Sequence, residues 1–176
     1  MDCSMISMDR TGRVIWITGL SGAGKTTLAR ALWPHLPDAI LLDGDELREV
    51  LAATGTGFDA ASRKALALTY ARFARLLARQ GRTVMVATIS LFHEVHAWNR
   101  ENLPGYLEVF LDVPEDVRRA RDPKGLYAAE RQGVVRQMAG GETHVEVPLT
   151  PDVRLDASLS LEESVRRVLA AMAGRA

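Results

Sequence analysis

The chain has 176 residues, of which 47% are hydrophobic and 25% are charged, a composition that suits one globular domain and excludes a disordered chain. Lysine and arginine together number 22, as do aspartate and glutamate, so no overall field would draw the surface to nucleic acid or to an anionic membrane. The sequence contains no run of about 18 apolar residues, which excludes a membrane-spanning helix.

Residues 1–12 are predicted to form a flexible leader. This stretch is polar and lacks the apolar core of a secretory signal. Its Cys3 is the only cysteine of the chain, so no intramolecular disulfide can form and nothing points to an oxidising compartment. We therefore expect a cytoplasmic protein whose single folded domain spans residues 13–176.

Short apolar runs bounded by turn residues alternate with helical stretches along the whole domain. The runs are rich in β-branched residues, as expected for strands that are buried on both faces, and the alternation predicts a three-layer α/β fold with helices on both faces of a parallel sheet of about five strands. The predicted strands are residues 13–18, 39–43, 83–87, 106–111 and, more weakly, 153–156. The predicted helices are residues 25–36, 45–53, 60–80, 94–102, 114–121 and 161–172.

Residues 122–151 fit neither pattern. They contain four glycines, no clear strand and few apolar runs, and they are too many for an ordinary tight connection. We expect a mobile lid here.

A phosphate-binding motif follows the first predicted strand and precedes the first predicted helix. It satisfies G-x-x-x-x-G-K-[ST] in full and in the strand–loop–helix context that the motif requires. Such a loop turns several backbone N–H groups toward one anion, and the helix N-terminus adds its positive end. We expect these residues to bind the phosphates of ATP: Gly19, Leu20, Ser21, Gly22, Ala23, Gly24, Lys25, Thr26 and Thr27.

Two carboxylates, Asp43 and Asp45, lie at the carboxyl end of the second predicted strand. Lys25 should reach the β- and γ-phosphates, while the hydroxyl of Thr26 and the carboxylate of Asp43 should hold Mg²⁺, Asp43 through water. Asp45 is expected on the acceptor side, where it would accept the proton of an attacking hydroxyl; the alternative is that Asp45 only caps the helix that follows. Arg48, one turn further, would face the same opening.

Four segments together resemble the adenylylsulfate kinases. They are Gly19–Ala29, Leu42-Asp-Gly-Asp45, Ile89-Ser90 and Arg121-Asp-Pro-Lys-Gly-Leu-Tyr127, and the last of these is much more specific than the phosphate loop. The resemblance covers residues 14 to about 152. It implies a Mg²⁺-dependent transfer of the ATP γ-phosphoryl group to the 3′-hydroxyl of adenosine 5′-phosphosulfate, which yields the activated donor of sulfate assimilation, and it implies a homodimer.

The resemblance also assigns residues around the acceptor nucleotide. Lys124 and Arg131 match lid positions that would neutralise charge on the phosphoryl group. Ser90 matches a serine often described as a phosphorylated intermediate, but an in-line transfer needs no covalent enzyme species, so we expect Ser90 to hydrogen-bond the acceptor or to cap the strand end. The matched acceptor positions are Asp43, Asp45, Arg48, Phe58, Arg63, Ser90 and Lys124.

Several positions depart from the family pattern. Met138 stands where relatives carry a stacking phenylalanine, and Leu66 and Leu68 replace an asparagine and an arginine that contact the acceptor. Arg100 is expected to bind a phosphate or sulfate group, because its planar fork fits such an anion. These changes keep open a kinase for another nucleotide conjugate, such as cytidine diphosphoramidate. A nucleotide-binding regulatory module without catalysis is the alternative from a different class.

The segment after Ser90 contains His93, Glu94 and His96. A zinc site would need a third ligand at a diagnostic spacing. The start of a helix beside the acceptor pocket is the favoured alternative.

Overall fold

The central sheet of the computed structural model contains five parallel strands. The model describes residues 12–51, 57, 59–121 and 145–175. The parallel sheet agrees with the sequence-based prediction, and its strands lie in the order β2-β3-β1-β4-β5. Their bounds are β1 Arg13–Thr18, β2 Ile40–Asp43, β3 Thr83–Thr88, β4 Leu107–Asp112 and β5 Val153–Asp156.

Side chains of β1 alternate between the two faces of the sheet, as the period of a strand requires. Ile15 and Ile17 enter one apolar cluster, and Val14 and Trp16 enter a second. Both faces are covered by helices, which explains why the strand sequence is apolar throughout.

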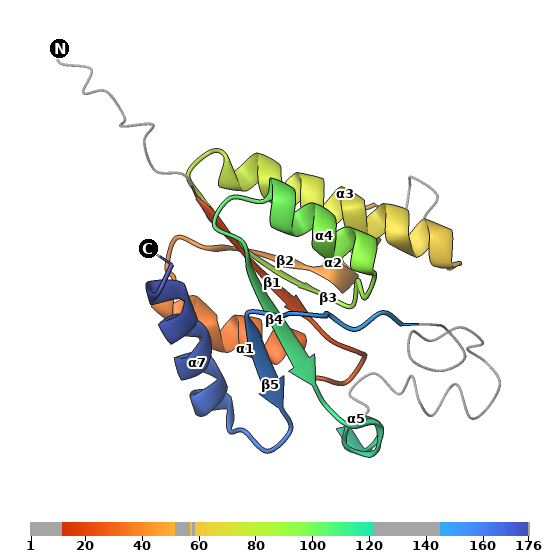
Figure 1. Cartoon of the computed structure of the whole chain (residues 1–176), viewed down its shortest axis with the longest axis vertical. Coiled ribbons are helices and arrows are strands. Elements are labelled where there is room, and N and C mark those ends of the chain that lie inside the picture. Colours follow the sequence, from red (N-terminus) through yellow and green to blue (C-terminus); the bar gives the residue numbers. More distant parts are fainter. Residues whose placement is uncertain (1–11, 52–56, 58, 122–144, 176) are drawn as a thin grey trace, which may run out of the picture.

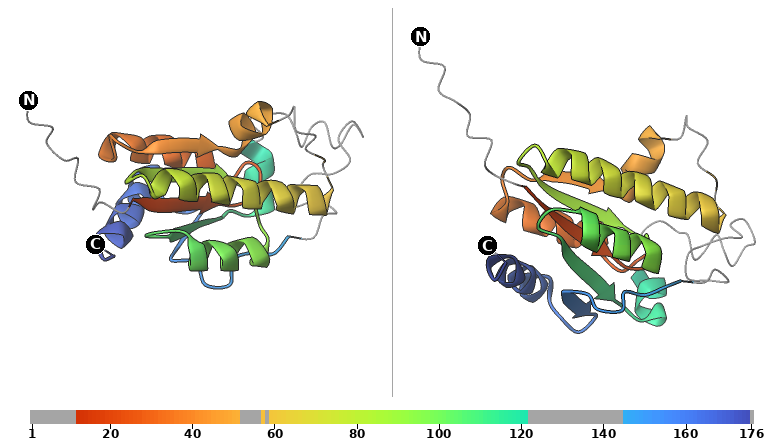
Figure 2. Two further views of the ribbon diagram at one scale, coloured as in Figure 1. Left: turned by 90° about the horizontal axis from the view of Figure 1, so that it is seen from above. Right: turned by 45° about the horizontal axis from the view of Figure 1, so that its top comes forward.

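Two pairs of helices make the outer layers (Figure 1). Helices α1 (Lys25–Leu32) and α7 (Leu161–Ala173) pack on the face of Ile15. Helices α3 (Ala60–Ala78) and α4 (His93–Asn102) cover the face of Trp16 and lie side by side in both views of Figure 2. The short helices are α2 (Gly44–Val50) and α5 (Glu115–Arg121).

Some element boundaries differ from the predicted ones. The first helix ends at Leu32, and residues Trp33–His35 form the 3₁₀ turn η1. Pro34 lacks the N–H that an α-helix needs at this point. Strands β3 and β4 each continue one residue further than predicted, to Thr88 and Asp112.

The remaining residues lie outside the described part of the chain: 1–11, 52–56, 58, 122–144 and 176. The predicted leader, most of the predicted lid, and the site residues Phe58, Lys124, Arg131 and Met138 therefore stay predictions. Within the described ranges, no helix combines the length and the apolarity needed to cross a membrane.

Candidate active site

The phosphate loop joins the end of β1 to the start of α1. Gly22 and Gly24 have φ angles of 78° and 97°, which L side chains rarely adopt. A Cβ atom on Gly22 would also lie 2.8 Å from the carbonyl oxygen of Arg118. The loop thus needs glycine for conformation and for space, and it delivers Lys25 to the first turn of α1.

Thr26 and Asp43 bring two hard oxygen ligands together. The Thr26 hydroxyl donates to Asp43 Oδ2 at 2.5 Å, and Asp43 is only 6% exposed. Asp43 Oδ1 accepts from the backbone N–H of Asp45 at 2.9 Å and so caps α2. The N-cap of α2 is therefore Asp43. The alternative prediction that Asp45 caps this helix is wrong, because α2 begins one residue earlier than predicted.

One open pocket, with a volume of about 980 Å³, lies along the carboxyl ends of the strands, where ligands bind in open α/β sheets. It joins the phosphate loop to α2, α3 and the end of β3. The structure brings these predicted site residues to its lining: Ser21, Gly22, Ala23, Gly24, Lys25, Thr26, Thr27, Asp43, Asp45, Arg48, Arg63 and Ser90.

Two arginines make the far end of this pocket basic. Arg48 comes from α2 and Arg63 from the first turn of α3. Burial lowers the pKa of Arg63, and the nearby charge of Arg48 lowers it further. Nε of Arg63 is buried, without a hydrogen-bond partner in the described residues. Guanidinium groups placed in this way suit an anionic group of a ligand.

Tyr70 is a pocket residue that the sequence analysis did not single out. Its side chain is 3% exposed, and its hydroxyl donates to the carbonyl oxygen of Gly44 at 3.2 Å. Burial raises the pKa of Tyr70 to about 12. The signal was present in the sequence, because Tyr70 follows Arg63 by seven residues and Leu66 by four and so shares their helix face.

Ser90, two residues beyond the end of β3, has an unusual backbone conformation. It is 7% exposed, and its φ angle of 31° makes it the one positive-φ residue other than glycine in the described ranges. The hydroxyls of Ser90 and Thr88 are 2.9 Å apart. Ser90 lines the pocket, so the structure places it where the sequence predicts.

Arg100 does not reach the pocket, contrary to expectation. Its guanidinium binds Glu108 Oε2 at 2.9 Å and Asp152 Oδ1 at 3.3 Å, and it also donates to the carbonyl oxygen of Thr150 at 3.1 Å. The cause is Glu108, a carboxylate that is 2% exposed and that needs a cation within reach. Arg100 thus pairs with the buried carboxylate of Glu108 and with Asp152, which lies just before β5.

His93, Glu94 and His96 point to three different places. His93 Nε2 lies 2.9 Å from the carbonyl oxygen of Val147, Glu94 pairs with Lys64 at 2.6 Å, and His96 is buried against Ser90. Over the described ranges, no three such side chains gather as metal ligands.

Comparison with known protein families shows to which family the chain belongs. The model of the adenylylsulphate kinase family matches residues 11–156. The chain belongs to this family. Adenylyl-sulfate kinase of Chloroflexus aurantiacus is 44% identical over 96% of this chain and 93% of its own length. Cytidine diphosphoramidate kinase of Campylobacter jejuni is 36% identical over 91% of this chain and 96% of its own length.

A solved structure agrees with this assignment. The Mycobacterium tuberculosis APS kinase CysC, in complex with AMPPNP and APS, is 35% identical, with a TM-score of 0.86 over 93% of this chain and 98% of that chain. The three-layer kinase fold predicted from the sequence is thereby confirmed.

The two leucines that depart from the adenylylsulphate kinase pattern lie differently. Leu66 is buried and lines the pocket. Leu68 is only partly buried, and it packs on the core cluster of α3 and α4 without lining the pocket. Only the first exchange therefore changes the pocket wall.

Proposed function

We propose that the protein is an ATP-dependent kinase that transfers the γ-phosphoryl group to the 3′-hydroxyl of adenosine 5′-phosphosulfate. The carrying observation is that one pocket joins residues 21–27 of the phosphate loop to Asp45, Arg48 and Arg63. Relatives at 42–44% identity are named adenylyl-sulfate kinase, which supports the same acceptor. The enzyme is a phosphotransferase with an alcohol group as acceptor.

The loop and α1 would hold the donor. Backbone N–H groups of the loop and the N-terminus of α1 bind the phosphates, and Lys25 adds a full positive charge. Thr26 and Asp43 offer the oxygen ligands that Mg²⁺ prefers. When bound, the ion would neutralise charge on the phosphates.

Asp45 would position the acceptor and take its proton. Its side chain is exposed at the pocket lining, and the N-cap of α2 is Asp43. A carboxylate within hydrogen-bond reach of the attacking hydroxyl is a suitable base. In-line transfer then needs no phosphorylated Ser90.

Arg48, Arg63 and Ser90 would bind the anionic end of the acceptor. The two guanidinium groups supply charge and hydrogen-bond donors, and the Ser90 hydroxyl adds a neutral donor. The family resemblance also proposes contributions from four residues outside the described ranges. Phe58 and Met138 would lie beside the acceptor, and Lys124 and Arg131 would lie beside the transferred phosphoryl group.

A second candidate is cytidine diphosphoramidate. Two observations favour it: a relative of that name is 36% identical over nearly its full length, and Leu66 places an apolar side chain on the pocket wall where an asparagine is usual in adenylylsulfate kinases. This acceptor would use the same donor site and the same Asp45. The non-catalytic regulatory module stays the alternative from another class.

Release of ADP from Mg-ATP by the purified protein tests these proposals. Adenosine 5′-phosphosulfate and cytidine diphosphoramidate are offered separately, and the phosphorylated product is identified by mass spectrometry. Turnover with the phosphosulfate supports the first proposal. Turnover with the cytidine compound alone replaces the acceptor, whereas ATP binding without turnover of either compound favours the regulatory module.

A homodimer is proposed from the family resemblance alone, and the cytoplasmic location expected from the sequence also stays a proposal. Light scattering of the purified chain measures its mass in solution. A mass of one chain contradicts the dimer.

A further inference from the structure

Ser90 holds a backbone conformation that needs support. Its φ angle of 31° lies in the left-handed region, which a residue with a Cβ atom occupies stably only when its surroundings impose it. Hydrogen bonds to the carbonyl oxygens of Ile89 and Ser90 impose this conformation. The Thr18 hydroxyl donates to the carbonyl oxygen of Ile89, and the Phe92 N–H donates to the carbonyl oxygen of Ser90 at 3.1 Å.

His96 supplies the second bond to that carbonyl. Its Nε2 lies 3.0 Å from the Ser90 oxygen, and because a carbonyl only accepts, Nε2 must carry the hydrogen. His96 is 6% exposed and does not line the pocket. Its ring therefore meets the pocket through the Ser90 carbonyl oxygen.

Glu108 lies next to the other side of the imidazole ring, where Nδ1 has no hydrogen-bond partner in the described residues. Glu108 Oε1 lies 3.8 Å from His96 Nδ1 and accepts from the Tyr106 hydroxyl at 2.9 Å. Glu108 Oε2 accepts from Arg100, also at 2.9 Å. Arg100 of α4 and Tyr106, just before β4, thus fix this buried carboxylate, and the hydrogen bond that holds the imidazole ring is the one from Nε2 to Ser90.

We propose that His96 is a positioning residue for the acceptor, which acts by locking the Ser90 backbone at the end of β3. The proposal rests on the proposed function, because it takes Ser90 as an acceptor ligand. If His96 only filled space in the core, its Nε2–H donor would not matter, and its replacement would not affect the binding of one substrate in particular. The donor is therefore the feature to test.

Two variants separate the donor from the packing. His96→Gln keeps an N–H at about the distance of Nε2, whereas His96→Leu keeps similar bulk without a donor. We expect His96→Leu to raise KM for the acceptor roughly 10-fold, the scale of one hydrogen bond to a charged ligand. The affinity for ADP should stay unchanged, and His96→Gln should restore most of the acceptor KM.

A double variant shows whether the effect passes through Ser90. Ser90→Ala alone should also raise the acceptor KM, and adding His96→Leu should then change it by less than about 2-fold, because coupled residues are not additive. Full additivity, or a fall in kcat with KM unchanged in a folded His96→Leu protein, would overturn the proposal.

An acceptor-independent measurement separates this proposal from the proposed function. The Phe92 amide shares the Ser90 carbonyl with His96, so its hydrogen exchange reports the local lock. We expect exchange to be about 10-fold faster in His96→Leu and near the wild-type rate in His96→Gln. If the wild-type protein used neither acceptor, the proposed function would fail, and exchange rates equal in both variants would independently reject the lock.

Discussion

Lys25 begins the helix that follows the phosphate loop, and its Nζ donates to the carbonyl oxygen of Leu20 at 3.0 Å. Lys25→Ala removes a full charge from the phosphate site, so we expect kcat/KM to fall by about 10²-fold or more. Circular dichroism should show an unchanged fold. Lys64→Ala is the matched control, because Lys64 pairs with Glu94 on the surface and does not line the pocket. Unaltered turnover of Lys25→Ala in the ADP-release assay would remove Lys25 from its role.

Asp43 and Asp45 are two residues apart and should respond differently to the same exchange. Asp45→Asn keeps the size but loses the base, so we expect kcat to drop by about 10²-fold. The free energy of unfolding should change by less than about 0.5 kcal/mol, because Asp45 is an exposed surface residue.

Asp43→Asn is the comparison variant. Asparagine caps helices as well as aspartate does, so α2 should remain, while the charge beside Thr26 is lost. We expect the Mg²⁺ concentration for half-maximal rate to rise in this variant and to stay constant in Asp45→Asn. Titration of Mg²⁺ at saturating ATP distinguishes the two carboxylates, and the reverse pattern would exchange their roles.

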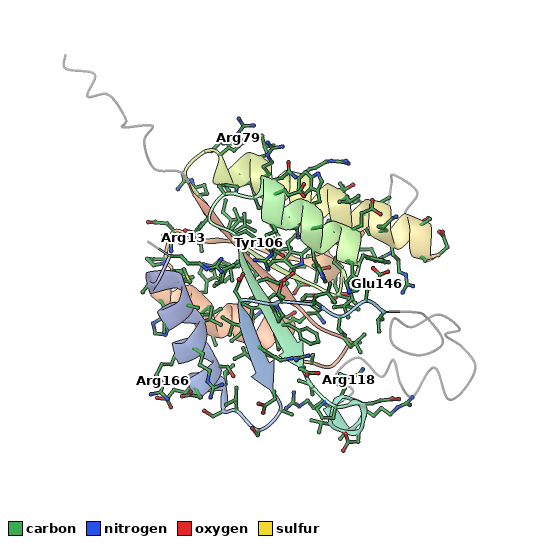
Figure 3. All side chains as sticks on the ribbon, viewed as in Figure 1. Arg13, Arg79, Tyr106, Arg118, Glu146 and Arg166 are labelled. Carbon is green, nitrogen blue, oxygen red and sulfur yellow. The ribbon has the colours of Figure 1, made fainter. Side chains whose placement is uncertain are left out.

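At the scale of elements, α4 connects the pocket to the segment that leads into β5. Its first turn binds Glu146 (Figure 3): the His93 N–H donates to Glu146 Oε2 at 2.6 Å, and the Glu146 N–H donates to the carbonyl oxygen of Leu91 at 3.2 Å. Its last turn carries Arg100 to Thr150 and Asp152. Both ends of α4 thus hold the described end of the predicted lid, residues 145–151.

Arg100→Met tests how much this attachment contributes to stability. It would leave Glu108 buried beside Tyr106 without its cation, so we expect a loss of roughly 2–3 kcal/mol in the free energy of unfolding. Glu94→Gln, on the same helix, breaks only the exposed pair with Lys64 and should cost under about 1 kcal/mol. Urea unfolding measures both. Equal losses would mean that the buried pair contributes no more than a surface pair.

Local patterns made the strands, the helices and the phosphate loop predictable. The loop needs only neighbouring residues, and a parallel strand shows its burial in its own composition. Arg100 was misplaced because its partners, Glu108 and Asp152, are 8 and 52 residues away. Tyr70 was not predicted as a pocket residue, because burial in the core and lining of a pocket produce the same periodicity on a helix. Tertiary pairing of this kind leaves no local signal.

At the scale of the whole molecule, two cores of different character flank the sheet. Under α1 and α7, the buried polar side chain that α7 contributes is the neutral Ser164. On the other face, the buried polar residues His96, Asn99 and Glu108 adjoin the apolar cluster under α3 and α4. In the described ranges, only that face buries a histidine. We therefore expect a fall in pH to destabilise the packing of that face first.

The pKa of His96 lies below its ordinary value of 6.5, because burial disfavours the charged ring more than Glu108 and the Ser90 carbonyl favour it. Glu146 also favours the charged form, and His93 opposes it. The unfolded chain therefore binds a proton at this histidine at a higher pH than the folded chain does. Stability from this source is complete above pH 6.5 and is lost as the pH falls toward the folded pKa.

We expect the free energy of unfolding of the wild-type protein to fall below pH 6.5 more steeply than that of His96→Gln, which has no titrating ring. The difference between the two curves should grow as the pH falls from 6.5 to 5, because the unfolded chain then takes up a proton that the folded chain binds less readily. His96→Leu should share the flatter curve of His96→Gln, although only the leucine variant disturbs Ser90. Urea titrations at a series of pH values measure all three proteins. Parallel curves for the wild type and His96→Gln down to pH 5 would show that the ring takes up its proton equally in the folded and unfolded chains.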